Sequence, residues 1–274
     1  MIFLKAGNIE ILFLISKVNH LKRYLFFLML ILSSFFSYAQ LNIKNDSIKK
    51  KQSQNLKFNT KQLIIPSVLF TYGLISIESD YLKLVNTQLR EEVQESIDEK
   101  ITIDDFTQYA PGISVYAINN LGIKGKNNLR DRSIILGTSY LLMGTTVYAL
   151  KNITKIERPD GSSFNSFPSG HTATAFAGAE FLWQEYKDVN IWYGISGYIV
   201  ATGTGFFRIY NGRHWLSDVV MGAGIGILTT KIAYWIFPYI DKHISEKNKN
   251  INSAMIAPFY NGNQLGLGMI INLN

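Results

Sequence analysis

The 274-residue sequence contains no cysteine, which excludes a disulfide framework and a thiolate metal site. Charged residues are also scarce, at 17%, whereas hydrophobic residues make up 47% of the chain. A typical soluble domain has more charge, but the mean hydropathy of +0.08 is low for a protein that lies entirely in lipid. The composition therefore falls between soluble and membrane proteins, and the individual segments must decide between them.

The excess of positive charge in this sequence is small outside the N-terminal region. The formal charge is +7, but the first 40 residues hold four basic residues and one acidic residue, which leaves 23 basic and 19 acidic residues beyond them. A net charge of +4 is weak support for a nucleic-acid partner, and none is expected. A preference for anionic lipid surfaces fits this charge equally well.

The N-terminal region has the order of a secretory signal. Lys22 and Arg23 precede an apolar run from Tyr24 to Phe36, and small residues at Ser37 and Ala39 follow. We predict that residues 1–39 are a signal peptide with a true start downstream of Met1, and that the protein is exported to the cell envelope. An uncleaved anchor is the alternative, although the run is shorter than the ~20 residues of a spanning helix.

Residues 40–61 are polar and without periodicity, which predicts a linker. Residues 62–240 contain apolar segments from which we expect about six helices and an all-α bundle. Between Val85 and Ile97, apolar residues recur every four positions among acidic residues, which predicts an amphipathic helix with a solvated face. The apolar segments are Leu63–Ile77, Tyr109–Leu121, Ser133–Leu150, Thr172–Tyr186, Ile191–Phe207 and Leu216–Ile240.

The apolar segments are of marginal length for crossing a membrane. Stretches of 15 to 18 uncharged residues either span a bilayer, with Lys and Arg reaching its surface, or form the core helices of a soluble periplasmic protein. We favour membrane embedding over the soluble form. Within Ile191–Phe207, the residues Gly194, Gly197, Gly203 and Gly205 would allow close contact with a neighbouring helix.

The C-terminal part, residues 241–274, is a polar linker followed by two short apolar arms. The arms are Met255–Tyr260 and Leu265–Leu273, and Asn261-Gly262 lies between them. This pattern predicts a small β-hairpin appendage. A disordered tail is the alternative.

Histidine is the other scarce residue, with four in the chain, and two of these lie between Lys151 and Asp218. His214 and Asp218 are four residues apart at the start of an apolar run, so we expect both on one helix face. There the carboxylate would hold the Nδ1 proton of the imidazole and leave Nε2 basic, able to attack phosphorus or accept a proton. A purely structural hydrogen bond would use the same spacing.

The sequence Pro168-Ser169-Gly170-His171 opens a helix-forming run. Ser169 is a natural N-cap, and Gly170 would let the first amide groups of the helix approach an anion such as phosphate. His171 would then stand beside that anion. A capped helix start with an incidental histidine is the alternative.

Three cations could meet at the same centre. Lys151 and Arg158 are seven residues apart, two helical turns if the helix continues to Pro159. Together with Arg208 they would surround one anion, and the planar fork of arginine suits phosphate oxygens. Taken singly, each could equally be a charge at a helix end.

In their order along the chain, these residues resemble the three motifs of the type 2 phosphatidic acid phosphatase (PAP2) superfamily, which also includes bacterial acid phosphatases and vanadium haloperoxidases. The motifs are Lys151 with Arg158-Pro159, then Pro168-Ser169-Gly170-His171, then Arg208 with His214 and Asp218. The resemblance covers about residues 63–240. One departure is Phe207, where the family commonly has serine.

The resemblance implies a PAP2-type helical bundle and a metal-independent phosphatase that hydrolyses a phosphomonoester or pyrophosphate. It implies that His214 is a nucleophile that forms a phosphohistidine, that Asp218 orients it, and that His171 protonates the leaving oxygen. The residues that would bind the phosphate are Lys151, Arg158, Ser169, Gly170 and Arg208. No cofactor or metal is expected, because His20 and His243 are isolated, although vanadate could occupy the phosphate site.

The substrate and the class of activity stay open at this point. A phosphorylated lipid is favoured, because apolar helices flank the site, with the active site facing the periplasm. The alternatives are a soluble periplasmic acid phosphatase acting on small phosphate esters, a vanadium-dependent haloperoxidase and, least favoured, a membrane scaffold without activity. A nucleotide P-loop is improbable, since Thr202-Gly203-Thr204-Gly205 is not followed by a Lys-Ser/Thr pair.

Overall fold

The computed structural model describes residues 60–95, 101–249, 254–260 and 265–271. The chain divides into two compact units, Met1–Asn55 and Leu56–Asn274, and the described residues all belong to the second. The predicted signal peptide and the predicted linker up to residue 59 lie outside the described residues.

The described residues form eight α-helices, more than the six or so expected. The six apolar segments and the amphipathic pattern correspond to seven of them, and the short helix α4 was not predicted. The predicted all-α class is confirmed. A 3-10 turn, η2 (Thr60–Leu63), precedes them; the helices are α2 (Ile64–Glu78), α3 (Asp80–Gln94), α4 (Asp104–Thr107), α5 (Ala110–Asn120), α6 (Leu129–Thr154), α7 (Gly170–Tyr186), α8 (Ile191–Tyr210) and α9 (Leu216–Lys249).

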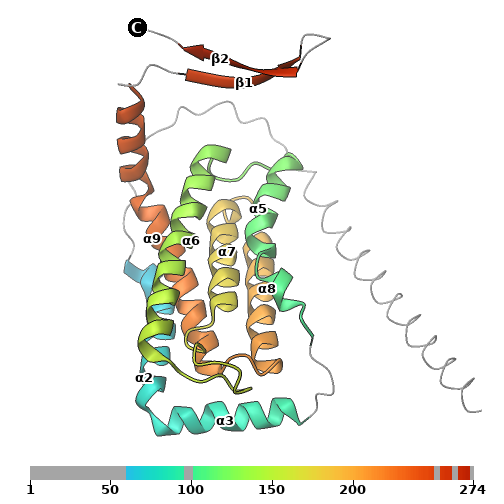
Figure 1. Ribbon diagram of the computed structural model, residues 1–274, viewed down its shortest axis with the longest axis vertical. Helices are drawn as coiled ribbons and strands as arrows, with labels where there is room; N and C mark the ends of the chain where they lie inside the picture. Colours follow the sequence, from blue (N-terminus) through green and yellow to red (C-terminus); the bar gives the residue numbers. More distant parts are fainter. Residues whose placement is uncertain (1–59, 96–100, 250–253, 261–264, 272–274) are drawn as a thin grey trace, which may run out of the picture. The chain divides into compact units, whose positions relative to one another are not determined.

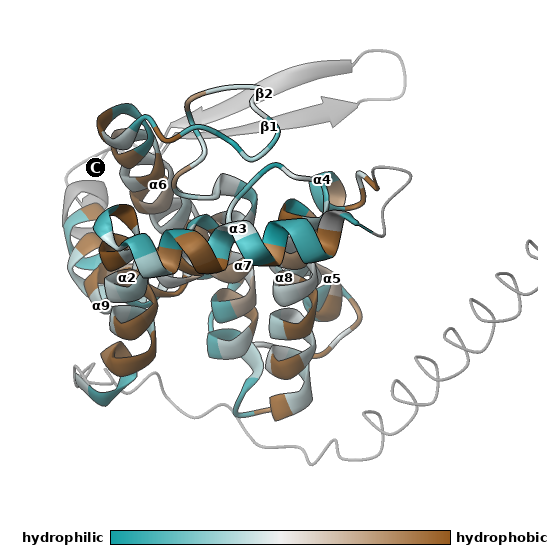
Figure 2. Ribbon diagram, turned by 90° about the horizontal axis from the view of Figure 1, so that it is seen from below, coloured by the Kyte–Doolittle hydropathy of each residue, from teal (hydrophilic) through white to brown (hydrophobic). Residues whose placement is uncertain are grey.

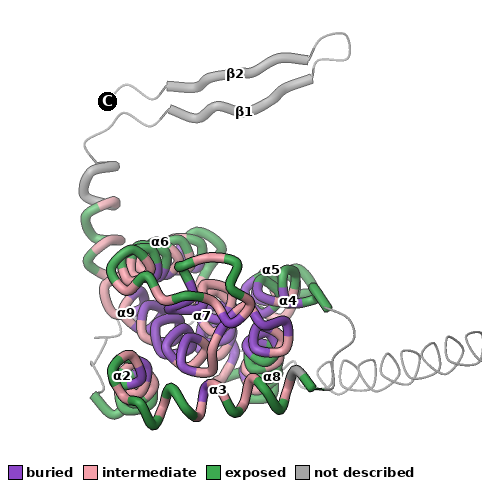
Figure 3. The backbone as a smooth tube through the Cα atoms, turned by 60° about the horizontal axis from the view of Figure 1, so that its bottom comes forward, coloured by how far each residue is buried: buried purple, intermediate pink, exposed green. Residues whose placement is uncertain are grey.

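Helix α7 lies at the centre of the bundle, in contact with α5, α6, α8 and α9 (Figure 1). Figure 3 shows most of α7 buried, whereas α2 and α6 have exposed outer sides. Its neighbours can approach closely because α7 is rich in small buried residues, namely Ala173, Ala175, Ala177 and Ala179. Contact with this central helix holds the other helices in position. Residues near the N-terminus of α7 are therefore also held in place.

Helices α9 and α8 contact α7 and each other through glycines. A Cβ at Gly222 of α9 would lie 2.5 Å from the carbonyl oxygen of Ser169, so α9 runs directly against the start of α7. On α8, a Cβ at Gly197 would lie 2.9 Å from Leu182 and one at Gly205 would lie 2.8 Å from Val219. The close contacts predicted for these α8 glycines are therefore confirmed.

The same prediction holds for Gly194 but is wrong for Gly203. A Cβ at Gly194 would overlap Trp183 of α7, whereas no atom of the described part of the chain lies within 4 Å of a Cβ placed at Gly203. Gly203 therefore faces open space on the outside of α8.

Helix α3 crosses one end of the bundle, as both Figure 1 and Figure 2 show. It ends at Gln94, earlier than the pattern up to Ile97 predicts. The amide of Asn86 donates to Ser217 Oγ at 2.9 Å and its Oδ1 accepts from the Ser217 backbone N–H at 3.1 Å. The guanidinium of Arg90 lies 5.7 Å from the ring centroid of Trp215. Helix α3 therefore anchors the first turn of α9.

Three helical segments in the described part of the chain are long and apolar enough to cross a membrane: Thr60–Glu78, Leu129–Thr154 and Leu216–Ile244. Two of them present large apolar side chains outward, such as Ile65 of α2 (67% exposed) and Leu141 of α6 (68% exposed). Exposure of such apolar surfaces to water is energetically unfavourable, whereas lipid accommodates them. These helices favour a membrane-embedded protein over a soluble one.

The strands β1 (Ala254–Tyr260) and β2 (Leu265–Ile271) pair antiparallel, with Ala254 opposite Ile271 and Tyr260 opposite Leu265. Residues 261–264 between them, with the predicted Asn261-Gly262 turn, lie outside the described residues. The complete hairpin and the proposed domain boundaries stay predictions.

The contact between α9 and α7 can be tested by adding one methyl group. We expect Gly222→Ala to destabilise the protein by about 1–3 kcal/mol, because the new Cβ overpacks against backbone that cannot move away easily. Thermal unfolding in detergent measures this. The matched control is Gly203→Ala, which should be neutral or stabilising by up to about 1 kcal/mol, since alanine favours a helix. Equal stability of both variants would contradict the role of Gly222.

Candidate active site

Asp218 and His214 form the most buried part of the site. Asp218 lies in the first turn of α9, but His214 precedes the helix, which begins at Leu216, so the expectation that both lie on one helix face is wrong. They still meet: Nδ1 of His214 is 3.4 Å from Oδ2 of Asp218. The same carboxylate oxygen accepts from the Trp215 backbone N–H at 2.9 Å, which fixes the loop over the helix start.

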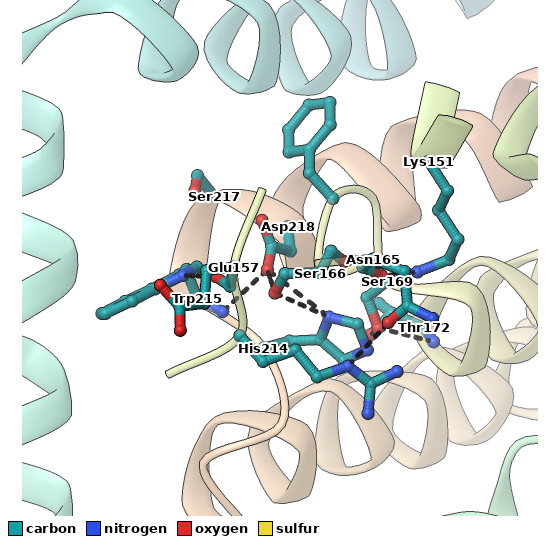
Figure 4. A network of polar contacts seen from close by, with 12 residues as sticks. Lys151, Glu157, Asn165, Ser166, Ser169, Thr172, His214, Trp215, Ser217 and Asp218 are labelled. Carbon is teal, nitrogen blue, oxygen red and sulfur yellow. Dashed lines mark hydrogen bonds and ion pairs between the residues drawn. The ribbon is translucent and has the colours of Figure 1, made fainter. Parts of the chain in front are cut away.

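Ser166 completes this group, and the sequence analysis missed it. Its hydroxyl donates to Oδ2 of Asp218 and lies 3.5 Å from Nδ1 of His214. Ser166 and Asp218 are both 0% exposed. Figure 4 shows the His214 ring, the Asp218 carboxylate and the Ser166 hydroxyl converging on one point. No sequence signal marks Ser166, because its contact depends on the path of the loop before Pro168.

Burial lowers the pKa of His214 to about 4, although its contact with Asp218 acts in the opposite direction. The positive charges of Lys151 and Arg208 lower this pKa further. The imidazole is therefore neutral at physiological pH. With Nδ1 facing the carboxylate, the nitrogen left for chemistry is Nε2.

The second motif begins the central helix, as predicted. Ser169 is the N-cap of α7, and its Oγ accepts from the Thr172 backbone N–H at 3.4 Å. Its own backbone N–H donates to the carbonyl oxygen of Asp218 at 3.0 Å, so the starts of α7 and α9 are joined. A Cβ at Gly170 would meet only Val147 at 3.8 Å, which leaves room beside this helix terminus.

Lys151 and Arg158 are brought together, but not by a continuous helix. Helix α6 ends at Thr154, and Lys155 adopts a left-handed conformation with φ 47°, so the two-turn spacing predicted for them is wrong. Asn165 joins them instead: Lys151 Nζ donates to its carbonyl oxygen, and Arg158 Nε donates to its side-chain Oδ1 at 3.0 Å. Burial lowers the pKa of Arg158, and the nearby charge of Arg208 lowers it further.

Arg208 occupies the last turn of α8. Its NH1 is 2.5 Å from Oδ2 of Asp104, and both side chains are buried. Its Nε is also buried and has no hydrogen-bond partner among the described residues. The charge of Arg208 lowers the pKa of both His171 and His214.

His171, on the first turn of α7, has a partner that the sequence did not reveal. Its Nε2 lies 2.9 Å from Oδ1 of Asp105 on α4. The neighbouring Asp104 binds Arg208 and accepts from Asn211 Nδ2 at 3.0 Å. Neither aspartate belongs to a motif, and both lie more than 60 residues before His171, so no local pattern could have indicated them.

Three residues of this group could in principle hold a metal ion. Asp104, Asp105 and His171 offer ligand atoms that lie within 4.8 Å of one another. Each of these side chains already has a partner, since Asp104 pairs with Arg208 and Asp105 pairs with His171. An ion would have to displace these contacts, so we interpret the group as paired charges rather than as metal ligands.

The site as a whole therefore gathers the predicted residues at one end of the bundle. The starts of α7 and α9 meet there with the end of α8 and with the loop that follows α6. Figure 4 shows Lys151 reaching from α6 toward Asn165, beside Ser169 and His214. Three cations, a neutral buried imidazole and the N-terminus of a helix can bind an anion with several oxygens.

Residues 132–242 match the PAP2 superfamily, and this stretch contains all three motifs. The match confirms the resemblance predicted from the motifs. A lipid A 1-phosphatase of Porphyromonas gingivalis is 37% identical over 172 residues, which are 59% of this chain and 38% of that protein. The chain thus spans less than half the length of this curated relative.

Two solved structures are also similar to this chain. LpxE of Aquifex aeolicus has 25% sequence identity and a TM-score of 0.42, over 55% of this chain and 94% of that one. The first transmembrane PAP2-type phosphatidylglycerolphosphate phosphatase from Bacillus subtilis has 21% identity and a TM-score of 0.40, over 68% of this chain and 98% of that one.

The buried pair of Arg208 and Asp104 should carry a large share of local stability. We expect Asp104→Ala to destabilise the protein by about 3–5 kcal/mol, because it leaves a buried guanidinium without its counter-charge. Chemical denaturation in detergent measures the loss. The double variant Asp104→Ala with Arg208→Met should recover part of it, since the isolated charge is then absent. Additive effects of the two substitutions would contradict the pairing.

Proposed function

We propose that this protein is a membrane lipid phosphatase that cleaves a phosphomonoester or pyrophosphate through a phosphohistidine on His214. The observation that carries the proposal is the buried His214, held at Nδ1 by Asp218 and lying among the cations Lys151 and Arg208. A neutral imidazole with a free Nε2 is a nucleophile suited to phosphorus. The match of residues 132–242 to the PAP2 superfamily supports it.

The cations suit the charge of the transferred group. In phosphoryl transfer the negative charge on the equatorial oxygens must be stabilised, and pre-positioned donors do this most effectively. The buried Nε of Arg208 has a hydrogen atom to donate and no described partner, and the amide groups at the start of α7 point out of the helix. These groups, with Lys151 and Arg158, form the phosphate-binding side of the site, and we propose that they act without a metal.

The first step forms one bond and breaks one. Nε2 of His214 attacks phosphorus, and the bond from phosphorus to the leaving oxygen breaks as His171 gives that oxygen a proton. His214 becomes positively charged in this step, and the Asp218 carboxylate at Nδ1 stabilises the new charge. In the second step water attacks phosphorus, its proton passes to His171, and the electron pair of the N–P bond returns to Nε2.

The lipid character of the substrate rests on the apolar helices and on the curated relative. Three described segments can cross a membrane, and α2 and α6 carry exposed apolar residues. The relative from Porphyromonas gingivalis is named a lipid A 1-phosphatase. We therefore propose a phosphorylated glycolipid of the lipid A type as the first substrate to test, with phosphatidylglycerol phosphate as the comparison.

Replacing the proposed nucleophile tests the function. We expect His214→Ala to lose turnover of lipid A 1-phosphate by several orders of magnitude while the protein still folds, because the group that attacks phosphorus is gone. Phosphate release in detergent micelles, with EDTA present, is the measurement. His243→Ala, which changes an exposed histidine near the end of α9, is the control. Undiminished hydrolysis by His214→Ala would remove the assignment, and inhibition by EDTA would remove the metal-independent mechanism.

The pKa of His214 gives a separate test that needs no substrate. Because burial lowers this pKa to about 4, the ring should stay neutral from high pH down to about pH 4 and become protonated only below it. A pH titration of ¹⁵N-histidine-labelled protein by NMR follows this, with His214→Gln to assign the signal. The competent, neutral nucleophile is therefore lost as pH falls, not as it rises. A midpoint near the ordinary histidine value of about 6.5 would contradict the buried, neutral imidazole.

A further inference from the structure

Helix α4 places two neighbouring carboxylates on two different partners in the site. Asp104 is buried, with a side chain that is 1% exposed, and it binds the guanidinium of Arg208. Asp105 has a side chain that is 53% exposed and faces His171, with Oδ1 at 2.9 Å from Nε2. The two carboxylates therefore have different nearest partners, although Oδ1 of Asp105 also forms a longer ion pair of 3.7 Å with NH1 of Arg208.

We propose that Asp105 is the positioning residue of the proton donor: it binds Nε2–H of His171 and thereby makes Nδ1 the nitrogen that protonates the leaving oxygen. This inference rests on the proposed phosphatase function. Among the described residues, the hydrogen-bond partner of the His171 ring is Asp105, at Nε2. The site then holds two carboxylate–imidazole pairs of opposite arrangement, since His214 meets Asp218 through Nδ1 and keeps Nε2 for phosphorus.

The helix α4 is well enough fixed to hold a ring in place. Asn211, at the end of α8, accepts from the Ile101 backbone N–H at 3.0 Å and donates to the Ile101 carbonyl oxygen at 2.8 Å and to Asp104 at 3.0 Å. At the other end, the hydroxyl groups of Thr107 and Thr204 are 2.9 Å apart. Asp105 is therefore exposed at its carboxylate, while residues on both sides of it in the chain hold α4 against α8.

The charges around His171 show what a carboxylate partner such as Asp105 does for the ring. Burial lowers the pKa of His171 and the guanidinium of Arg208, on α8, lowers it further, so both disfavour the protonated ring that an acid needs. The groups that oppose them are Asp105 and Asp104, both on α4, which raise this pKa. Asp104 lies 2.5 Å from Arg208 and Asp105 lies 3.7 Å from it. Of these two carboxylates only Asp105 has a direct contact with the ring, so the carboxylate that acts mainly on His171 is Asp105.

The proton balance follows from this arrangement. In the acid form both nitrogens of His171 carry hydrogen, with Nε2–H bound to Asp105 and Nδ1–H available to the leaving oxygen. The Nδ1 proton leaves as the bond from phosphorus to oxygen breaks, and the ring stays neutral with Nε2–H in place. The water of the second step returns a proton to Nδ1, which restores the starting state.

The dependence of rate on the leaving group tests this role. We expect Asp105→Asn to slow hydrolysis of an alkyl phosphate by about tenfold, because the leaving alkoxide needs a proton. Hydrolysis of p-nitrophenyl phosphate, whose leaving group depends less on a proton, should slow by less than about threefold. The alkaline side of the pH–rate profile should also move to lower pH, since loss of the carboxylate lowers the pKa at which the acid loses its proton. Asp188→Asn, the same change at an exposed residue beyond the far end of α7, is the matched control.

The outcomes separate this proposal from the function on which it rests. Equal slowing of both esters by Asp105→Asn, or an unmoved pH profile, would overturn the positioning role. If the wild-type protein hydrolyses neither ester, the proposed function fails, and NMR of ¹⁵N-histidine-labelled protein still tests the contact. The neutral His171 ring should carry its hydrogen on Nε2, and Asp105→Ala should weaken that preference. A ring protonated on Nδ1 in the wild-type protein would overturn the proposal without any assay of turnover.

Discussion

The arrangement of the site depends on how the buried carboxylate of Asp218 is satisfied. A carboxylate that is 0% exposed needs hydrogen-bond donors, and here three of them meet at Oδ2: the backbone N–H of Trp215, the hydroxyl of Ser166 and the ring of His214. Oδ1 has no hydrogen-bond partner among the described residues. These donors belong to the α8–α9 connection and to the loop after α6. Satisfying one buried group therefore brings two distant segments together, and the position of His214 follows from it.

A second constraint is the close contact between the helices that carry these segments. Gly222 allows α9 to run against the carbonyl of Ser169, and the N–H of Ser169 in turn binds the carbonyl of Asp218. The N-terminus of α7 and the first turn of α9 are thus fixed to each other by backbone contacts. Since helix N-termini attract anions, an apolar bundle acquires a polar end without losing its packing.

The long helices could be predicted from the sequence, because they depend on local patterns. Apolar periodicity located the long helices, and Ser169 was recognised as an N-cap from its neighbours alone. What it could not predict depends on the path of the chain. Lys155 ends α6 in a left-handed conformation without being glycine, and Asp105 meets His171 across 66 residues. Such contacts arise from tertiary packing, which no spacing rule encodes.

The positive charges of the site repel one another, and this repulsion is part of how the site can bind an anion. The pKa of Arg158 is lowered by burial and then by Arg208 and Arg213, so the cations of the site are held together at an electrostatic cost. Asp104 forms an ion pair with Arg208 at NH1, whereas Nε of Arg208 has no hydrogen-bond partner among the described residues. A phosphate group offers several oxygens to such donors at once. In the proposed function, the charges that repel one another would become favourable contacts with a bound phosphate, and this difference would favour phosphate over a neutral group.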